Sequence, residues 1–216
     1  MKIFDWVLDL LFPRKCVLCG KLLEKHETDL CRSCRVETEE YPEGKTKIQF
    51  LDSFHAVWYY KGYVRRSLLR YKFHGCRGFA GAYGRMVAMK VSGSCPEGFD
   101  LLTWVPVSRA RKFRRGYDQV ELLAKAVGRE LGMTPVPLLR KIRNNRPQSG
   151  ISGAAQRRAN VLGAYVLTGK ADVRGKRILL LDDILTTGAT AGECGRMLLT
   201  AGAGEVHCAV VAAARD

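Results

Sequence analysis

The fold of this chain is decided by one stretch, Ile178-Leu-Leu-Leu-Asp-Asp-Ile-Leu-Thr-Thr-Gly-Ala-Thr190. Four consecutive aliphatic residues are typical of a strand that is covered on both faces, as in a parallel sheet. The small residues that follow the two acids are typical of a loop that leads into a helix. In open α/β sheets, ligands bind beyond the carboxyl ends of the strands. The stretch therefore predicts a buried strand, a binding loop and a helix start.

This loop has the chemistry of a phosphate site. Hydroxyls and accessible backbone amides gather at the start of the expected helix, in Thr186, Thr187, Gly188, Ala189 and Thr190. A helix N-terminus of this kind attracts anions. Asp182 and Asp183 accept hydrogen bonds and suit sugar hydroxyls or a metal. A ligand that satisfies both groups is a sugar phosphate. The alternative is an ordinary strand that ends in a turn, but adjacent carboxylates beside four buried aliphatic residues are costly without a partner.

The same thirteen residues resemble the phosphoribosyl pyrophosphate (PRPP) motif of type I phosphoribosyltransferases. In that family the two acids contact the 2′ and 3′ hydroxyls of the ribose, and the loop wraps the 5′-phosphate. The resemblance implies that Asp182 and Asp183 orient the sugar during catalysis and that residues 186–190 bind the 5′-phosphate of PRPP. It also implies magnesium, held mainly by the oxygens of the ligand.

Length and composition indicate a globular protein with polyanionic partners. The chain has 216 residues, of which 47% are hydrophobic, enough for one good-sized domain and a small module. Its formal charge of +15 points either to nucleic acid or to a substrate with several phosphates. Residues 3–12 are mostly apolar, but Asp5 and Asp9 interrupt them and no cleavage site follows. We expect an amphipathic helix that ends at Pro13, no membrane insertion and a cytoplasmic protein.

Two CxxC pairs predict a metal centre near the N-terminus. Cys16 and Cys19 form the first pair, and Cys31 and Cys34 form the second. Four thiolates in this spacing are typical of a structural zinc site with no open coordination position. Two disulfides or a redox pair are the alternatives, which a cytosolic location and the duplicated motif disfavour. We expect His26, between the pairs, to be a surface residue.

Hydrophobic periodicity and turn residues predict the remaining elements. Strands are expected at residues 54–60, 101–107, 163–167, 177–181 and 205–213, and helices at 62–72, 79–91, 119–131 and 188–202. Asp118 is expected to cap the third of these helices. The predicted fold class is α/β, a mostly parallel sheet flanked by helices. The predicted domains are residues 1–48, with the N-terminal helix and the zinc module, and residues 49–216.

Two charged segments add candidate binding residues. Five of the eight residues from Arg109 to Gly116 are basic, and they follow a predicted strand. A loop there would lie at the same sheet edge as Asp182, so Arg109 and Arg111 suit a diphosphate. A solvated basic loop or a nucleic-acid patch are the alternatives. Residues 140–160 have little apolar periodicity and many charges, and loops of this length are active-site lids or disordered segments.

The whole chain resembles the ComF family, the competence-associated phosphoribosyltransferase-like proteins of bacteria. The resemblance rests on the four cysteines and the PRPP motif, and on Leu11-Phe-Pro13, Tyr71-Lys-Phe-His-Gly75, Val105-Pro-Val107 with the arginines after it, Arg115-Gly116, Gln148 and Arg158-Ala-Asn160. The family usually has Gly-Phe-Asn-Gln where this chain has Gly116-Tyr-Asp-Gln119.

This resemblance implies a zinc-ribbon-like module on a phosphoribosyltransferase domain, with a role in handling single-stranded DNA and a helicase as a candidate partner. Two classes of function follow. The chain is either a transferase that moves phosphoribosyl from PRPP to a nitrogen nucleophile, or a non-catalytic module that senses PRPP and binds single-stranded DNA or a helicase. The acceptor, the oligomeric state and the directness of DNA binding stay open at this point.

Overall fold

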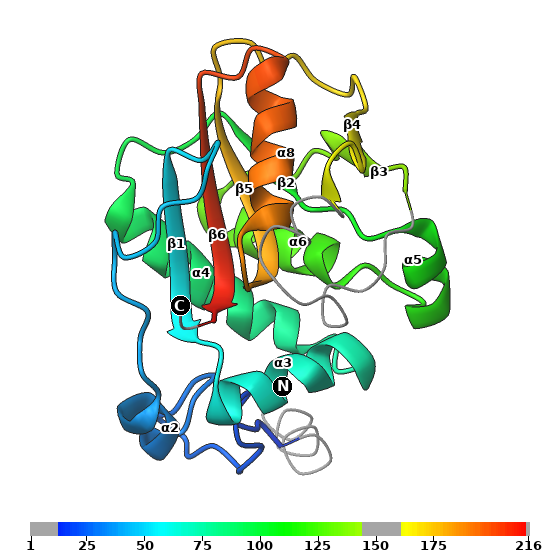
Figure 1. Cartoon of the computed structure of the whole chain (residues 1–216). Helices are drawn as coiled ribbons and strands as arrows, with labels where there is room; N and C mark the ends of the chain where they lie inside the picture. Colours follow the sequence, from blue (N-terminus) through cyan, green and yellow to red (C-terminus); the bar gives the residue numbers. More distant parts are fainter. Residues whose placement is uncertain (1–12, 144–160, 215–216) are drawn as a thin grey trace.

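The computed structural model describes residues 13–143 and 161–214. Within these residues, a four-stranded parallel sheet forms the centre of the molecule, with the strand order β1-β6-β5-β2 (Figure 1). The strands are β1 (Ser53–Tyr59), β2 (Leu101–Trp104), β5 (Arg177–Leu185) and β6 (Glu205–Ala213). The predicted parallel sheet is confirmed.

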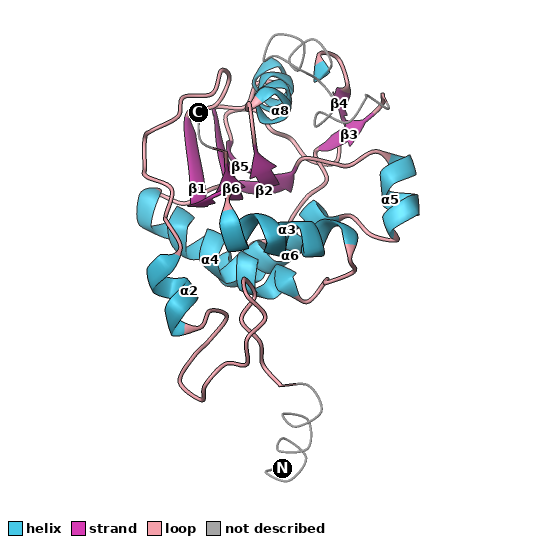
Figure 2. Ribbon diagram, turned by 60° about the horizontal axis from the view of Figure 1, so that its bottom comes forward, coloured by secondary structure: helices cyan, strands magenta, loops and turns pink. Residues whose placement is uncertain are grey.

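Helices cover both faces of this sheet (Figure 2). One face carries α3 (Gly62–Phe73), α4 (Phe79–Ser94) and α6 (Gln119–Leu131), and the other carries α8 (Ala189–Thr200). The aliphatic run of β5 divides between the two layers. Leu179 and Leu181 pack in the core with α3, α4 and α6, whereas Ile178 and Leu180 pack with α8. The unbroken apolar run is therefore explained by burial of both strand faces.

Helix α6 begins where the sequence predicts. The Asp118 carboxylate accepts hydrogen bonds from the backbone amides of Val120 (2.9 Å) and Glu121 (3.1 Å). Gly132 ends the helix in the left-handed conformation, with φ of 67°. The carboxylate that distinguishes this chain from the usual Gly-Phe-Asn-Gln pattern is thus a helix cap.

The strand predicted at residues 163–167 is present but lies outside the main sheet. It is β4 (Tyr165–Leu167), which pairs antiparallel with β3 (Leu139–Lys141) in a separate two-stranded sheet. Leu139 and Tyr165 pack into the apolar cluster that includes Leu198 of α8. Burial against this helix therefore holds the small sheet beside the large one.

The basic segment after β2 is a helix, not the predicted loop. Helix α5 spans Arg109–Arg115, and the Ser108 hydroxyl caps it by accepting a hydrogen bond from the Arg111 amide at 3.4 Å. Gly116 ends it with φ of 73°. A cap at each end stabilises one short helix in a segment with no apolar periodicity.

The cysteine module, residues 13–45, packs on α3. It contains the short helix α2 (Arg32–Glu37). Arg70 of α3 donates hydrogen bonds to the carbonyl oxygens of Leu18 (2.6 Å) and Val17 (3.2 Å). Val17 and Leu18 belong to the same apolar cluster as the α3, α4 and α6 layer. The division of the chain at residue 48 stays a prediction.

Some predictions fall outside the described residues. They are the N-terminal helix within residues 1–12, most of the segment 140–160, and the motif residues Gln148 and Arg158–Asn160. Among the helices of the described residues, none combines the length and the apolar character that crossing a bilayer requires.

Candidate functional site

A cavity of about 670 Å³ opens at the carboxyl ends of β2 and β5. Its lining includes the sequence-predicted residues Arg111, Asp182, Asp183, Thr186, Gly188, Ala189 and Thr190. Two predicted residues lie outside this lining. Arg109 is exposed at the start of α5, and Thr187 is half-buried in the loop before α8. The structure therefore brings most of the predicted binding residues to one place.

The two acids of the motif lie within β5. This strand spans Arg177–Leu185, whereas the sequence predicted a strand that ends at residue 181, before the acids. Asp182 is in register with Val210 of β6, and the pairing extends to the end of the strand. Successive side chains of a strand point to opposite faces. Asp182 and Asp183 therefore meet different surroundings.

Asp183 is held by two residues from the α3 and α6 layer. Asp183 is 3% exposed, and its carboxylate forms an ion pair with the Lys72 ammonium at 2.9 Å. The Gln119 side-chain amide donates a second hydrogen bond to it at 3.2 Å. A buried carboxylate with a counter-ion and an amide donor is satisfied without a ligand.

Asp182 has one hydrogen bond within the described residues, accepted from the backbone amide of Asp183 at 2.8 Å. Burial of the carboxyl group and the negative charge of Asp183 raise the pKa of Asp182 well above its ordinary value, although Lys72 acts in the opposite direction. A carboxylate in this position gains most from a ligand that brings hydroxyl donors or a cation. Of the two acids, Asp182 therefore has more capacity left to accept hydrogen bonds from a group in the cavity.

The loop between β5 and α8 forms the base of the cavity. Gly188 caps α8 with φ of +70°, and an added Cβ would lie 3.1 Å from the Ile48 side chain. The positive φ favours glycine at this position, and Ile48 leaves little room for a side chain. The Thr187 hydroxyl oxygen is buried and has no hydrogen-bond partner within the described residues. The first amides of α8 and the loop hydroxyls together form a seat for an anion.

Basic side chains line the opposite wall. The arginines at positions 111, 114 and 115 of α5 line the cavity because residues three and four apart share one helix face. Arg109 falls outside this face. Arg115 donates a hydrogen bond to Gln119 at 2.9 Å, and its guanidinium lies 4.7 Å from the Phe73 ring centroid. Lys141 of β3 also lines the cavity, and burial lowers the pKa of its ammonium, with a further contribution from Arg111.

Sequence reasoning gave no role to Lys72, Gln119 or Lys141. Lys72 and Gln119 lie in two motifs that the sequence contains, Tyr71–Gly75 and Gly116–Gln119. The structure brings these motifs together. Tyr71 donates a hydrogen bond to the backbone carbonyl of Gln119 at 2.5 Å, and the Tyr117 hydroxyl donates one to the carbonyl of Tyr71 at 2.5 Å.

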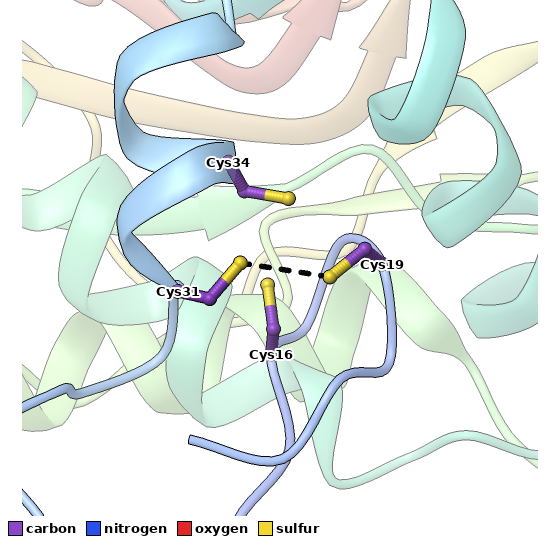
Figure 3. A group of neighbouring side chains, drawn as sticks. All are labelled: Cys16, Cys19, Cys31 and Cys34. Carbon is purple, nitrogen blue, oxygen red and sulfur yellow. Dashed lines mark hydrogen bonds between the residues drawn. The ribbon is translucent and has the colours of Figure 1, made fainter. Parts of the chain in front are cut away.

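The four cysteines form a separate candidate metal centre (Figure 3). Their sulfur atoms all lie within 4.8 Å of one another, and the Cys19 and Cys31 sulfurs are 3.6 Å apart. Tetrahedral zinc with bonds of about 2.3 Å would separate its sulfur ligands by roughly 3.8 Å, so the donor set fits this ion. Although burial opposes it, hydrogen bonds from the backbone amides of Cys19 and Cys31 lower the pKa of Cys16 to about 7. The His26 side chain is 76% exposed, as predicted.

Comparisons with known proteins match both parts of the chain. A double zinc ribbon domain matches residues 7–45, and a phosphoribosyl transferase domain matches residues 121–216. Competence protein ComFC of Bacillus subtilis is 29% identical over 191 residues, which is 87% of this chain and 72% of that protein. Competence protein ComFC of Streptococcus pneumoniae is also 29% identical, covering 89% of this chain and 96% of that protein.

One partial match among solved structures is glutamine PRPP amidotransferase from B. subtilis, complexed with ADP and GMP. Its TM-score is 0.45 at 21% sequence identity, and the match covers 66% of this chain and 30% of that one. The two ComFC proteins align with more than four fifths of this chain, and each of its two regions matches the corresponding domain model. The chain is therefore similar to the ComFC competence proteins over most of its length, and its two regions match a zinc ribbon and a phosphoribosyl transferase domain.

Proposed function

We propose that this protein binds PRPP in the cavity at the carboxyl edge of the sheet and transfers its phosphoribosyl group to a nitrogen nucleophile. One observation carries the proposal. A single cavity of about 670 Å³ is lined by an acid suited to sugar hydroxyls, Asp182, by the anion seat at the start of α8, and by Arg111 and Arg114.

The arrangement suits displacement at the anomeric carbon of the ribose. The bond from this carbon to the diphosphate oxygen breaks, and pyrophosphate leaves with the electron pair. The lone pair of the nitrogen forms the new bond, and the nitrogen then releases a proton. Positive charge develops on the ring, so the protein needs chiefly to orient the sugar and to neutralise the departing diphosphate. Asp182 performs the first task, and the α5 arginines perform the second.

Magnesium would enter mainly on the phosphate oxygens of the ligand, because Asp183 is already ion-paired and one further carboxylate makes a poor cage for this ion. Zinc has a structural role in the proposal. The four cysteines would fill its coordination sphere and leave no position for a reacting water.

Calorimetric titration of PRPP with magnesium tests the binding step. The substitution Asp182→Asn weakens the acceptance of hydrogen bonds from the ribose, and a charge-assisted hydrogen bond contributes roughly 1.5 to 3 kcal/mol. We expect affinity to fall by about one to two orders of magnitude. Asp172→Asn, at an exposed site away from the cavity, is the control. Wild-type protein that binds no PRPP, or an Asp182→Asn variant that binds it unchanged, would refute the proposal. Pyrophosphate release over a panel of bases and amines tests turnover.

The names of the relatives suggest the biological setting. Since two of them are competence proteins, we include in the proposal a role in natural competence and DNA uptake, in the cytoplasm and with a helicase as a candidate partner.

A second candidate function is a non-catalytic PRPP sensor that binds single-stranded DNA. It is favoured by Phe113, which is 92% exposed among the basic residues of α5 and so offers a base-stacking platform. The test is a DNA titration at several salt concentrations with wild type and Phe113→Ala. We expect steep salt dependence and weaker binding by the variant. Binding that is insensitive to both changes would exclude this candidate.

A further inference from the structure

Helix α3 contacts the cysteine module and carries Lys72, the residue that forms the ion pair with Asp183. On the module side, Ser67 donates a hydrogen bond to the Val17 carbonyl, and Arg70 donates to the carbonyls of Val17 and Leu18. Val17 and Leu18 are the two residues between Cys16 and Cys19. The helix is therefore bonded to the backbone of the first CxxC pair.

This contact is buried and fixed. Ser67 is 0% exposed, and Val17 and Leu18 are 3% and 1% exposed. Because the Ser67 hydroxyl donates to Val17, it accepts its second hydrogen bond from the Tyr83 hydroxyl, at 2.6 Å. The Arg70 guanidinium lies 5.3 Å from the Phe79 ring centroid. Movement of the CxxC backbone would leave the buried Ser67 hydroxyl and the half-buried Arg70 guanidinium without these acceptors, which is costly.

The next two residues link the helix to Gln119 and to Asp183, and Lys72 lines the cavity. Tyr71 is hydrogen-bonded to the segment that carries Gln119, and Lys72 forms the ion pair with Asp183. Gln119 donates to the same carboxylate. Residues 67–72 span less than two helical turns. The module and the acid are thus joined by one short, rigid segment.

We propose that Ser67 and Arg70 are positioning residues through which the zinc-bound cysteine module sets Lys72 against Asp183 and so shapes the cavity. Zinc fixes the conformation of the first CxxC pair, and its carbonyls therefore stay directed at α3. Without the ion, these carbonyls lose their alignment, the helix loosens, and Asp183 loses a well-placed counter-ion. The identity of the cavity ligand rests on the proposed function, whereas the mechanical link does not.

The first experiment is a cycle of binding measurements. PRPP with magnesium is titrated into wild type and into the double variant Ser67→Ala, Arg70→Met, each zinc-loaded and each treated with a chelator. We expect chelation to weaken PRPP binding about tenfold in wild type. In the double variant, chelation should change the affinity little, because the effects of changes within one network are not additive. Arg66→Met is the matched control, since Arg66 lies on the same helix and stacks on Tyr63 at 4.4 Å. Arg70→Lys, which keeps one donor, should restore part of the affinity.

The second experiment reads the link without any ligand. The side-chain nitrogen signal of Lys72 is followed by NMR with labelled lysine, together with hydrogen exchange of the Asp183 amide. Chelation, Ser67→Ala alone and the double variant should each shift the lysine signal and speed the exchange, whereas Arg66→Met should do neither.

The two experiments separate the two proposals. A Lys72 signal that ignores zinc removal, or additive effects in the binding cycle, would overturn the positioning role. A Lys72 signal that responds to zinc in a protein that binds no PRPP would overturn the proposed function alone.

Discussion

Asp182 and Asp183 are adjacent in the chain but carry different energetic roles. Asp183 has a counter-ion and an amide donor, so its charge is compensated in the protein without a ligand. Asp182 faces the cavity with one backbone donor, and burial followed by the charge of Asp183 raises its pKa well above the ordinary 3.8. Ionising Asp182 therefore costs free energy in the unliganded protein, and unfavourable local features of this kind are typical of binding sites.

Asp182→Asn should therefore stabilise the protein at neutral pH while it weakens ligand binding. A carboxyl group whose pKa is higher in the folded state destabilises the fold once the pH exceeds its unfolded value, and each unit of elevation is worth about 1.4 kcal/mol. The advantage of the variant should thus be present at pH 7 and vanish as the pH falls to about 3.8. Urea unfolding of wild type and variant at pH values from roughly 3.5 to 7 measures this difference in the free energy of unfolding. A variant that is less stable than wild type at pH 7 would contradict this assignment.

At the scale of elements, α4 and α6 pack against each other at close range. An added Cβ at Gly84 would lie 2.5 Å from the Ala126 Cβ and 2.8 Å from its backbone carbonyl carbon. Backbone atoms cannot move aside as a flexible side chain can. Glycine at position 84 therefore allows the two helices to approach this closely. The pairing positions Gln119, at the start of α6, beside Asp183.

Gly84→Ala should destabilise the protein by about 1 to 3 kcal/mol, the usual range for overpacking a core. Gly93→Ala on the same helix is the control, because nothing lies within 4 Å of its added Cβ. This control should be neutral or more stable by up to about 1 kcal/mol, owing to the better helix propensity of alanine. Thermal unfolding of both variants measures the contrast, and equal melting temperatures would show that α4 and α6 do not pack this closely.

On the scale of the whole molecule, the cysteine module shares its core with the phosphoribosyltransferase-type domain. Cys16, Val17 and Leu18 belong to one apolar cluster with Tyr71 of α3 and Leu123 of α6. A loss of order in the module would therefore expose apolar surface of the larger domain as well.

Zinc should co-purify at one ion per chain, and its removal should lower the melting temperature of the entire chain. Metal binding is coupled to folding, since the ion binds the folded module and not the unfolded one. Metal analysis of freshly purified, reduced protein and calorimetric melting with and without a strong chelator measure both effects. Absence of zinc would refute the metal centre. A main transition that keeps its melting temperature after chelation would show that the two parts unfold independently.

The sequence by itself determined the elements whose signals are local. The aliphatic run and the small-residue turn predicted β5 and the start of α8, and Asp118 predicted the start of α6. The CxxC spacing predicted a cluster of four cysteines, which the structure shows. Each of these patterns lies within a few neighbouring residues, where backbone geometry and capping decide the conformation.

Only the tertiary structure decided the partners of these elements. Lys72, Gln119 and Asp183 come from three elements far apart in the chain, and no local pattern links them. The placement of β3 and β4 outside the main sheet depends on packing against α8. Arg111 lines the cavity and Arg109 does not, which depends on the face that α5 turns to the cavity. Contacts of this kind follow from how the core packs as a whole, because side-chain burial and long-range pairing override the periodicity of any single segment.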